Sequence, residues 1–373
     1  MTLSFYVHIP YCIKRCGYCD FNTYTPSELQ DGATLEIVSN DYIDAVLKEL
    51  ETTPTDEVPT IFFGGGTPSL LPAHDLGRVI STIKARNGLA PDCEITLEAN
   101  PDSITAEKLA QYLEVGFNRI SFGMQSAKSH VLAVLDRTHN PANVEKSVSL
   151  ARAAGFKSIS VDLIYGTPGE SLADWQETVQ AALALDIDHI SAYALIIETG
   201  TKLAAQIKRG DLAMPDDDLM ADMYLLVDQL CEANGMTWYE ISNWSKPGHE
   251  CSHNIAYMRH INWWGLGPGA HSHIDGKRFW NVKHPTAYKN KVFAGESPIA
   301  ESENLTAEQK IDESILLGIR RRQGLLIELL LPHQLELLAS YRENGFVELV
   351  AGRVVLTPTG RLIADQIVRE ITI

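Results

Sequence analysis

The sequence predicts an α/β protein with a parallel sheet, and two observations support this prediction. From residue 1 to about residue 235, short runs of apolar and β-branched residues alternate with segments of helical periodicity. Each helical segment can also connect two neighbouring strands, and parallel strands require crossover connections of this kind. The alternation alone leaves two architectures open, a doubly wound open sheet and an incomplete barrel.

The expected elements of this first domain, residues 1–235, follow one another at short intervals. The expected strands are Leu3–Ile9, Pro59–Phe63, Glu94–Leu97, Arg119–Phe122, Ser158–Leu163 and His189–Ala194. The helices expected between them cover residues 40–52, 73–86, 105–114, 143–154 and 171–185.

Polar or glycine-rich residues follow nearly every expected strand. They are Gly64-Gly65-Gly66-Thr67-Pro68, Glu98-Ala99-Asn100-Pro101, Gly123-Met124-Gln125-Ser126, Tyr165-Gly166-Thr167-Pro168-Gly169-Glu170, and Tyr193 in the last strand. Any one of these segments alone is what a turn between a strand and a helix requires. In a barrel, however, all such strand ends meet on one face, where this fold places its sites.

The opening loop contains the most specific signal in the chain, three cysteines at C-x3-C-x2-C spacing. Cys12, Cys16 and Cys19 follow the first expected strand, and Gly17 disfavours a regular helix there. Three thiolates hold a metal centre but leave it one ligand short, which keeps a position for another molecule. A zinc site completed by His8 and a set of free cysteines are the alternatives.

The three consecutive glycines, Gly64 to Gly66, are a weaker signal. Glycines allow a backbone to approach a ligand closely and expose its N–H groups. No Gly-Lys-Ser or Gly-Lys-Thr follows, so the segment is not a phosphate-binding P-loop, and no G-x-G-x-x-G begins a helix here.

The composition changes between residues 236 and 303. Five of the six tryptophans and six of the 12 histidines lie in this segment or at its edge. They are Trp238, Trp244, Trp263, Trp264 and Trp280, and His249, His253, His260, His271, His273 and His284. This density suits a flat apolar ligand that carries a metal or carboxylates. An aromatic layer that closes the open side of the sheet is the alternative.

Residues 304–373 predict a small winged-helix-like domain. Helical patterns cover 307–319 and 332–343, a hairpin follows through Ala351-Gly352, and a last helix begins after Pro358-Thr359-Gly360. The basic run Arg320-Arg321-Arg322 suggests DNA binding, but there is no basic recognition helix. We therefore expect a structural cap or a surface for a partner protein.

Composition and charge exclude several classes of protein. Hydrophobic residues make up 45% and charged residues 21%, as in ordinary globular proteins. The net charge of −17 disfavours general binding to nucleic acids or acidic membranes. We find no signal peptide and no apolar run long enough to cross a bilayer. Half of the six cysteines lie in one loop, which is not a secreted disulfide framework, so we expect a cytoplasmic protein.

Taken together, these residues resemble the radical S-adenosylmethionine (SAM) superfamily, in its branch related to coproporphyrinogen III dehydrogenase. The resemblance covers the whole chain and rests on the cysteine loop with Tyr18, the GGGTP segment, Glu98-Ala99-Asn100-Pro101, residues 118–126, residues 162–166 and the tail. It implies an incomplete (βα)6 TIM-like barrel. It also implies a [4Fe–4S] cluster on Cys12, Cys16 and Cys19, whose open iron binds the amino and carboxylate groups of SAM.

The resemblance also implies the rest of the SAM site. Its residues are Tyr6, Tyr18, Gly65, Gly66, Thr67, Glu98, Gln125, Arg137, Asp162, Ala194 and His271. A zwitterionic sulfonium ligand needs carboxylate, guanidinium and backbone partners in a dry pocket, and this set supplies them. An electron donor would reduce the cluster, and that electron would cleave a carbon–sulfur bond of SAM to give an adenosyl radical.

Two groups in this branch differ in function. The dehydrogenases decarboxylate two propionates of coproporphyrinogen III; they carry a fourth cysteine, at the position of Phe21, and an N-terminal arm. Here the first strand begins at about residue 3, which leaves no room for such an arm. HemW-type relatives bind heme and pass it to acceptor proteins. Both departures predict a heme chaperone, with oxygen-independent coproporphyrinogen III dehydrogenase as the disfavoured alternative.

The heme contact is expected in the segment from His253 to Met258. HemW-type relatives carry the motif H-N-x-x-Y-W, and this chain reads His253-Asn254-Ile255-Ala256-Tyr257-Met258. We expect His253 to contact heme, together with Tyr257. Met258, which replaces the tryptophan, either binds iron or fills the same space.

Overall fold

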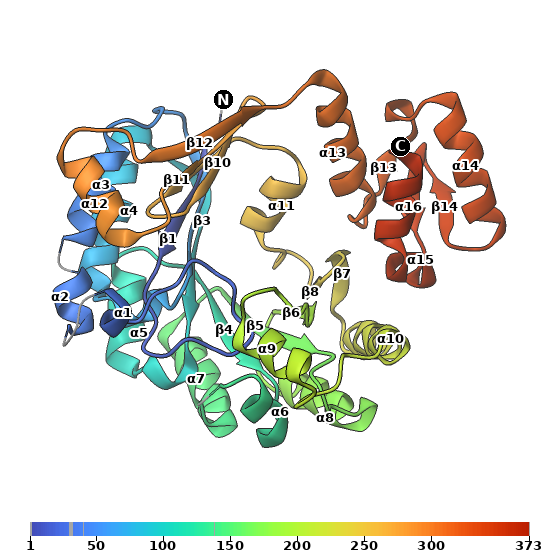
Figure 1. The fold of residues 1–373 in the computed structure, drawn as a ribbon, viewed down its shortest axis with the longest axis horizontal. Helices are drawn as coiled ribbons and strands as arrows, with labels where there is room; N and C mark the ends of the chain where they lie inside the picture. Colours follow the sequence, from blue (N-terminus) through green and yellow to red (C-terminus); the bar gives the residue numbers. More distant parts are fainter. Residues whose placement is uncertain (1, 30–32, 40, 138, 373) are drawn as a thin grey trace.

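A parallel sheet forms the centre of the computed structural model, which describes residues 2–29, 33–39, 41–137 and 139–372 (Figure 1). Its parallel strands lie side by side in sequence order. They are β1 (Ser4–Ile9), β2 (Val58–Gly65), β3 (Leu89–Ala99), β4 (Arg119–Gln125), β5 (Ser158–Tyr165) and β6 (His189–Ala194). The structure thus confirms the strands that the sequence predicts and their parallel arrangement.

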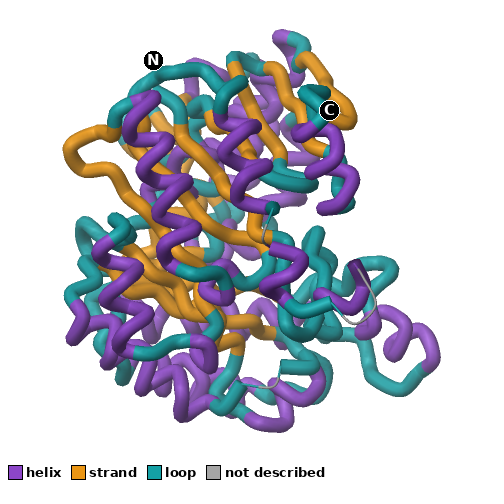
Figure 2. Tube along the Cα trace, turned by 90° about the vertical axis from the view of Figure 1, so that its left-hand side faces the viewer, coloured by secondary structure: helices purple, strands orange, loops and turns teal. Residues whose placement is uncertain are grey.

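Helices connect these strands and pack along the sheet (Figure 2). They are α1 (Pro26–Leu29), α2 (Leu35–Ser39), α3 (Tyr42–Leu50), α4 (Ala73–Asn87), α5 (Ala106–Glu114), α6 (Ser129–Val134), α7 (Pro141–Ala154), α8 (Leu172–Leu183), α9 (Lys202–Arg209) and α10 (Asp217–Ala233). The predicted helices correspond to α3, α4, α5, α7 and α8. Residue 40, the expected start of the first of these, lies outside the described residues.

Local sequence features set the ends of these helices. Ser171 caps α8, because its hydroxyl accepts from the Asp174 N–H while the Asp174 carboxylate accepts from the Ser171 N–H. Asn140 caps α7 and Pro141 occupies its first position. Gly155 ends α7 in the left-handed region, at a φ of 108°, which a glycine adopts without strain.

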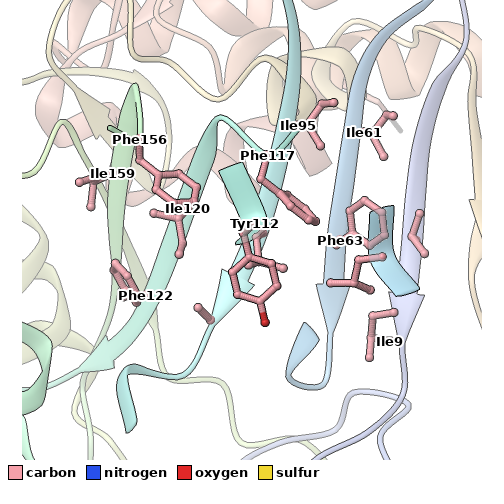
Figure 3. Close-up of a cluster of buried hydrophobic side chains, with 14 of the residues drawn as sticks. Ile9, Ile61, Phe63, Ile95, Tyr112, Phe117, Ile120, Phe122, Phe156 and Ile159 are labelled. Atoms are coloured by element: carbon pink, nitrogen blue, oxygen red, sulfur yellow. The ribbon is translucent and has the colours of Figure 1, made fainter. Parts of the chain in front are cut away.

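The main core lies on the face of the sheet that the helices cover (Figure 3). Phe117 contacts Phe63 of β2 and Tyr112 of α5 edge to face, with ring centroids 5.1 and 5.7 Å apart. Successive residues of a strand point to opposite faces. Ile159 of β5 therefore enters the core, whereas the neighbouring Ser160 points to the other face and lines a cavity.

Residues 236–303 add strands to both edges of the parallel sheet. β7 (Thr237–Glu240) and β8 (Asn243–Ser245) extend it beyond β6, and β9 (Trp263–Leu266) pairs in parallel with β1. β10 (His271–Ile274), β11 (Lys277–Asn281) and β12 (Ile299–Asn304) continue from β9 as antiparallel strands. The sheet thus has 12 strands. Two helices complete the segment, α11 (Ser252–Met258) and α12 (Pro285–Phe293).

The C-terminal residues, described up to 372, form a smaller α+β unit with its own hydrophobic core. Its elements are α13 (Ala307–Ile319), β13 (Leu325–Leu326), α14 (Pro332–Glu343), β14 (Val347–Val350), β15 (Arg353–Leu356), α15 (Pro358–Leu362) and α16 (Ala364–Ile371). Ala351 and Gly352 join β14 to β15, and both have a positive φ, 48° and 75°, as a tight hairpin turn requires. The predicted hairpin and helices are confirmed.

No helix in the described part of the chain has both the length and the apolar character needed to cross a membrane.

Candidate functional site

One cavity, with a volume of about 1390 Å³, brings nearly all the predicted site residues together. Its wall contains the cysteine loop, the ends and inner faces of the parallel strands, α11 and part of the C-terminal unit. The predicted residues that line it are Tyr6, Cys12, Cys16, Tyr18, Cys19, Gly65, Gly66, Thr67, Glu98, Gln125, Arg137, Asp162, Ala194, His253 and Tyr257. His271 is the exception, because it lies outside the wall and stacks on Trp280 at 5.3 Å.

Hydrogen bonds from neighbouring segments position the cysteine loop. The Cys12 N–H donates to the Tyr24 carbonyl over 3.1 Å, which closes the loop on itself. The Thr67 hydroxyl donates to Cys12 Sγ over 3.6 Å, and Arg137 Nη1 donates to Cys16 Sγ over 3.7 Å. Hydrogen bonds to sulfur are among the features that tune an iron–sulfur cluster.

The three thiols fit a cluster better than they fit a zinc site with His8. The His8 ring is already engaged, since Nδ1 lies 3.1 Å from Tyr6 Oη and Nε2 lies 2.9 Å from the Asn22 carbonyl oxygen. Among the described residues, no three His, Cys, Asp or Glu side chains are placed to hold a single metal ion. Burial raises the pKa of Cys12 to about 11 and also raises that of Cys19. Metal coordination is what deprotonates such thiols at neutral pH.

The glycine segment holds the cysteine loop close to β2. The Gly66 N–H donates to the Ile9 carbonyl over 2.7 Å, and the Thr67 N–H donates to the Tyr11 carbonyl over 2.8 Å. A Cβ at Gly66 would lie 2.5 Å from that Tyr11 oxygen, so a larger residue would force the two segments apart. These N–H groups therefore donate hydrogen bonds to the cysteine loop itself. The glycines allow the backbone of β2 to lie close to this loop, as well as close to a ligand.

Two carboxyl groups lie deep in the cavity. Glu98 accepts from the Gly65 N–H over 3.1 Å, and burial together with the negative charge of Asp162 raises the pKa of Glu98 to about 8. The Ser121 hydroxyl lies 3.0 and 3.1 Å from the two oxygens of Asp162, whose pKa burial also raises. Two such groups close together bind a cationic ligand well, because its charge relieves their mutual repulsion.

A guanidinium group faces these carboxyl groups from the cysteine side. Arg137 Nη2 donates to the Gly123 carbonyl over 2.7 Å, while Arg137 Nε is buried and has no hydrogen-bond partner among the described residues. Gln125 next to it has a φ of 61°, which is unusual for a residue with a side chain. A buried unpaired donor and a strained backbone are both typical of a binding site. Together with the carboxyl groups, Arg137 can hold a zwitterion.

His253 is a buried residue of the cavity wall. It is 1% exposed and stacks on Phe62, with ring centroids 5.2 Å apart. Its Nδ1 lies 2.8 Å from Thr60 Oγ1, and its Nε2 lies 2.8 Å from Tyr257 Oη. Burial lowers its pKa to about 3, so the ring is neutral at physiological pH. Met258, by contrast, does not line the cavity.

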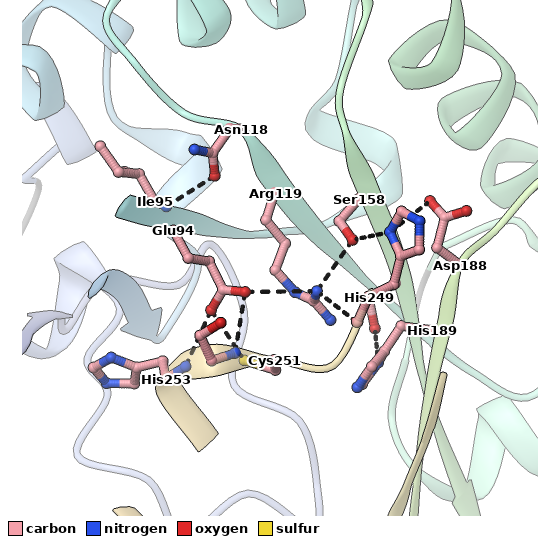
Figure 4. A network of polar contacts seen from close by, with 12 residues as sticks. Glu94, Ile95, Asn118, Arg119, Ser158, Asp188, His189, His249, Cys251 and His253 are labelled. Carbon is pink, nitrogen blue, oxygen red and sulfur yellow. Dashed lines mark hydrogen bonds and ion pairs between the residues drawn. The ribbon is translucent and has the colours of Figure 1, made fainter. Parts of the chain in front are cut away.

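A buried ion pair fixes the start of α11 (Figure 4). The Glu94 carboxylate accepts from the N–H groups of Ser252 and His253, each over 3.1 Å. Arg119, which is 3% exposed, lies 3.7 Å from Glu94 and donates to the His249 carbonyl over 2.9 Å. Glu94, which lies on β3, thus caps the N-terminus of α11. In most helices the N-cap residue itself supplies this hydrogen bond.

Several residues of the cavity wall carry no specific functional signal in the sequence. Arg119 and His189 are the first residues of two expected strands. A charged or polar side chain next to an apolar run was the feature that could have indicated their role. Arg320 and Arg361 come from the C-terminal unit. Arg320 belongs to the basic run that the sequence shows, but no local pattern assigns either arginine to this cavity, because only the docking of that unit on the barrel brings them there.

Comparison with known proteins shows which family the chain resembles. The family model of the radical SAM superfamily matches residues 6–182. The chain is 44% identical to the heme chaperone HemW of Mycobacterium tuberculosis, over 98% of this chain and 94% of the relative. It is 34% identical to HemW of Bacillus subtilis, over 98% of this chain and 97% of the relative.

A solved structure shares the fold of the whole chain. The coproporphyrinogen III oxidase HemN of Escherichia coli, described as a radical SAM enzyme, aligns with a TM-score of 0.83 at 23% identity, covering 98% of this chain and 89% of that one. This likeness concerns the fold alone. Because the HemW matches cover nearly the whole chain at 34–44% identity, the chain belongs to the radical SAM superfamily and, within it, to the HemW family.

Proposed function

We propose that this protein is a heme chaperone that holds a [4Fe–4S] cluster with SAM, binds heme and passes the heme to acceptor proteins. One observation supports the proposal most strongly: a single cavity contains both the three cysteines and the histidine of α11. At about 1390 Å³, it is larger than the roughly 300–1,000 Å³ typical of a site for one small molecule.

In this proposal Cys12, Cys16 and Cys19 hold the cluster, which supplies the electron for cleavage of SAM when both are bound. Arg137 binds the carboxylate of SAM, and Glu98 and Asp162 bind its cationic groups. The rest of the SAM site consists of residues that line the same cavity, which supports their assignment. They are Tyr6, Tyr18, Gly65, Gly66, Thr67, Gln125 and Ala194. His271 stays a weaker member of this set, because it lies outside the wall.

Heme is the cargo, and His253 and Tyr257 are its proposed contacts. Both side chains line the cavity. His253 carries a ring nitrogen able to bind heme iron, whereas Tyr257 offers its aromatic ring as a contact for the porphyrin. The dehydrogenase alternative has less support, because Phe21 stands where the dehydrogenases carry a fourth cysteine. Phe21 is 64% exposed at the rim of the cavity, and so is the neighbouring Ile13, at 75%.

The partners of this protein follow from the same proposal. A cluster that delivers electrons requires an electron donor, and a carried heme requires an acceptor protein. The exposed apolar side chains of Ile13 and Phe21 suit contact with such proteins. A cytoplasmic location fits the free thiols, since a reducing compartment keeps them available for iron.

Anaerobic reconstitution with iron and sulfide, followed by heme titration, tests the proposal. We expect the wild-type protein to show a cluster absorption band and to bind about one heme per chain. Cys12→Ala should abolish the cluster without unfolding the barrel, and His253→Ala should weaken heme binding. Zinc in place of iron in the purified protein, or full heme affinity in His253→Ala, would contradict the assignment of these residues.

A further inference from the structure

Hydrogen bonds behind His253 select one tautomer of its ring. The Thr60 hydroxyl donates to Ser4 Oγ over 2.9 Å, and Thr60 Oγ1 lies 2.8 Å from His253 Nδ1. A hydroxyl has a single proton, so Thr60 accepts a hydrogen bond from His253. The proton of the neutral imidazole is therefore on Nδ1, and Nε2 carries the lone pair.

Tyr257 covers that lone pair. Its hydroxyl lies 2.8 Å from His253 Nε2 and, because Nε2 has no proton, the phenol is the donor. The two rings meet edge to face, with centroids 4.7 Å apart and planes at 75°. His253 thus has the arrangement of a histidine ligand before its metal arrives: one nitrogen is fixed by a hydrogen bond, and the other presents its lone pair to Tyr257, which also lines the cavity.

The two ends of α11 are held unequally. Glu94 binds the first turn through the N–H groups of Ser252 and His253, so the backbone of His253 is fixed to β3. Tyr257 lies one turn later, next to Met258, the last residue of the helix. Beyond the helix, His260 has a φ of 53°. His253 is therefore the fixed partner of this pair. Nε2 is uncovered when Tyr257, whose ring packs edge to face on Trp263 with centroids 4.8 Å apart, gives up its hydrogen bond.

We propose that Ser4 and Thr60 are positioning residues that present His253 Nε2 to heme iron, and that the Tyr257 hydroxyl occupies this nitrogen until iron replaces it. The inference rests on the proposed function, since heme is the cargo in both. On binding, a coordinate bond forms from the Nε2 lone pair to iron, and the hydrogen bond from Tyr257 breaks. The phenol keeps its proton, and no electron is transferred.

Thr60→Val tests the positioning role. Valine has nearly the same shape but accepts no hydrogen bond, so the His253 proton moves to Nε2, where it can donate to the Tyr257 oxygen, and the lone pair moves to Nδ1. We expect heme affinity to fall about 10- to 100-fold, as for other groups that orient a metal ligand. The absorption spectrum of bound heme should change as well.

Thr178→Val is the matched control. Thr178 lies on α8 and is buried like Thr60, its Oγ1 accepts from the Ala127 N–H over 3.2 Å, and it does not line the cavity. The same substitution there should leave heme affinity and the heme spectrum unchanged. If Thr60→Val fails to fold, Ser4→Ala decides, because it frees Thr60 to donate to Nδ1 and should also weaken heme binding and alter the spectrum.

Tyr257→Phe should have the opposite effect. Phenylalanine keeps the ring contacts but leaves Nε2 uncovered, so heme should bind at least as tightly as to the wild type, faster, and with the wild-type spectrum. Equal affinities of the Thr60→Val and Thr178→Val proteins, or a loss in Tyr257→Phe as large as that in Thr60→Val, would overturn the inference. Absence of heme binding in the wild type would instead overturn the proposed function itself.

Discussion

Glu98 shows how the cavity changes the chemistry of a single residue. Water would keep this carboxyl ionised at neutral pH, but burial and the nearby Asp162 raise its pKa to about 8. In the folded protein Glu98 therefore holds a proton at neutral pH that the unfolded chain has lost. Without a cationic ligand, the charged form of this group opposes folding.

This difference predicts how stability depends on pH. The contribution of Glu98 is fully present below its unfolded pKa of about 4.5 and is lost as pH rises through about 8. Wild-type stability should therefore fall between these values, by at most about 1.4 kcal/mol per pH unit from this group. Glu98→Gln, which stays neutral, should show a flatter profile in chemical unfolding at pH 5, 6.5 and 8. Identical profiles of the two proteins would refute the assignment.

Residue patterns in the sequence located the cysteines but not their partners. The spacing of Cys12, Cys16 and Cys19 is local, so it can be read directly from the chain. Arg119 lies far from Glu94 and Cys251 in sequence, and only the fold places the three together (Figure 4). His253 was expected from its motif, whereas the Thr60 and Ser4 partners that fix its tautomer have no sequence signature.

At the scale of elements, α11 depends on a cap that comes from β3. The helix has seven residues, too few to be stable alone, and Cys251 at its N-cap makes no side-chain capping bond. Glu94 supplies that bond, and Arg119 balances its charge. The position of His253 in the cavity therefore depends on an ion pair outside the helix.

Glu94→Ala should destabilise the protein by about 3–5 kcal/mol, because it leaves Arg119 buried without its carboxylate. Amide hydrogen exchange should increase first at the start of α11, around Ser252. Glu94→Gln is the matched variant, since it keeps an acceptor for the helix N–H groups but removes the charge, and it should protect α11 better than alanine does. Wild-type exchange rates in α11 of the alanine variant would disprove the cap.

The helices and strands that were predicted from the sequence are those in which apolar residues recur with a clear period. The six strands and the helices α3, α4, α5, α7 and α8 have clear apolar patterns, and the hairpin has a turn signal at Ala351-Gly352. The strands β7 to β12 were not predicted, because they are short and mix aromatic with polar residues. The pairing of β9 with β1 and of β8 with β6 is a long-range interaction, and no local propensity encodes it.

At the scale of the molecule, one arginine links the C-terminal unit to the barrel. Arg361 donates to both oxygens of Asp228 on α10, over 2.8 and 2.6 Å, and its guanidinium lies 4.4 Å from the Trp238 ring centroid. Arg361 is 5% exposed. A paired, stacked guanidinium of this kind is a strong contact, so it fixes the unit that completes the cavity wall.

Arg361→Ala should loosen this docking by about 3 kcal/mol, because Asp228 then remains partly buried without its cation. Heme should dissociate faster, since the C-terminal unit lines the cavity, and protease cleavage between residues 300 and 310 should increase. The double variant Arg361→Ala, Asp228→Ala should recover part of the lost stability. Unchanged heme dissociation and protease resistance in the single variant would contradict a role for this contact.

The most direct test of heme as cargo is one anaerobic experiment on the reconstituted protein. Heme is titrated in one sample, and coproporphyrinogen III is supplied with SAM and a reductant in a parallel sample. We predict saturable binding of about one heme per chain and no vinyl product from coproporphyrinogen. Vinyl product formed with consumption of SAM, in a protein that does not bind heme, would contradict the account.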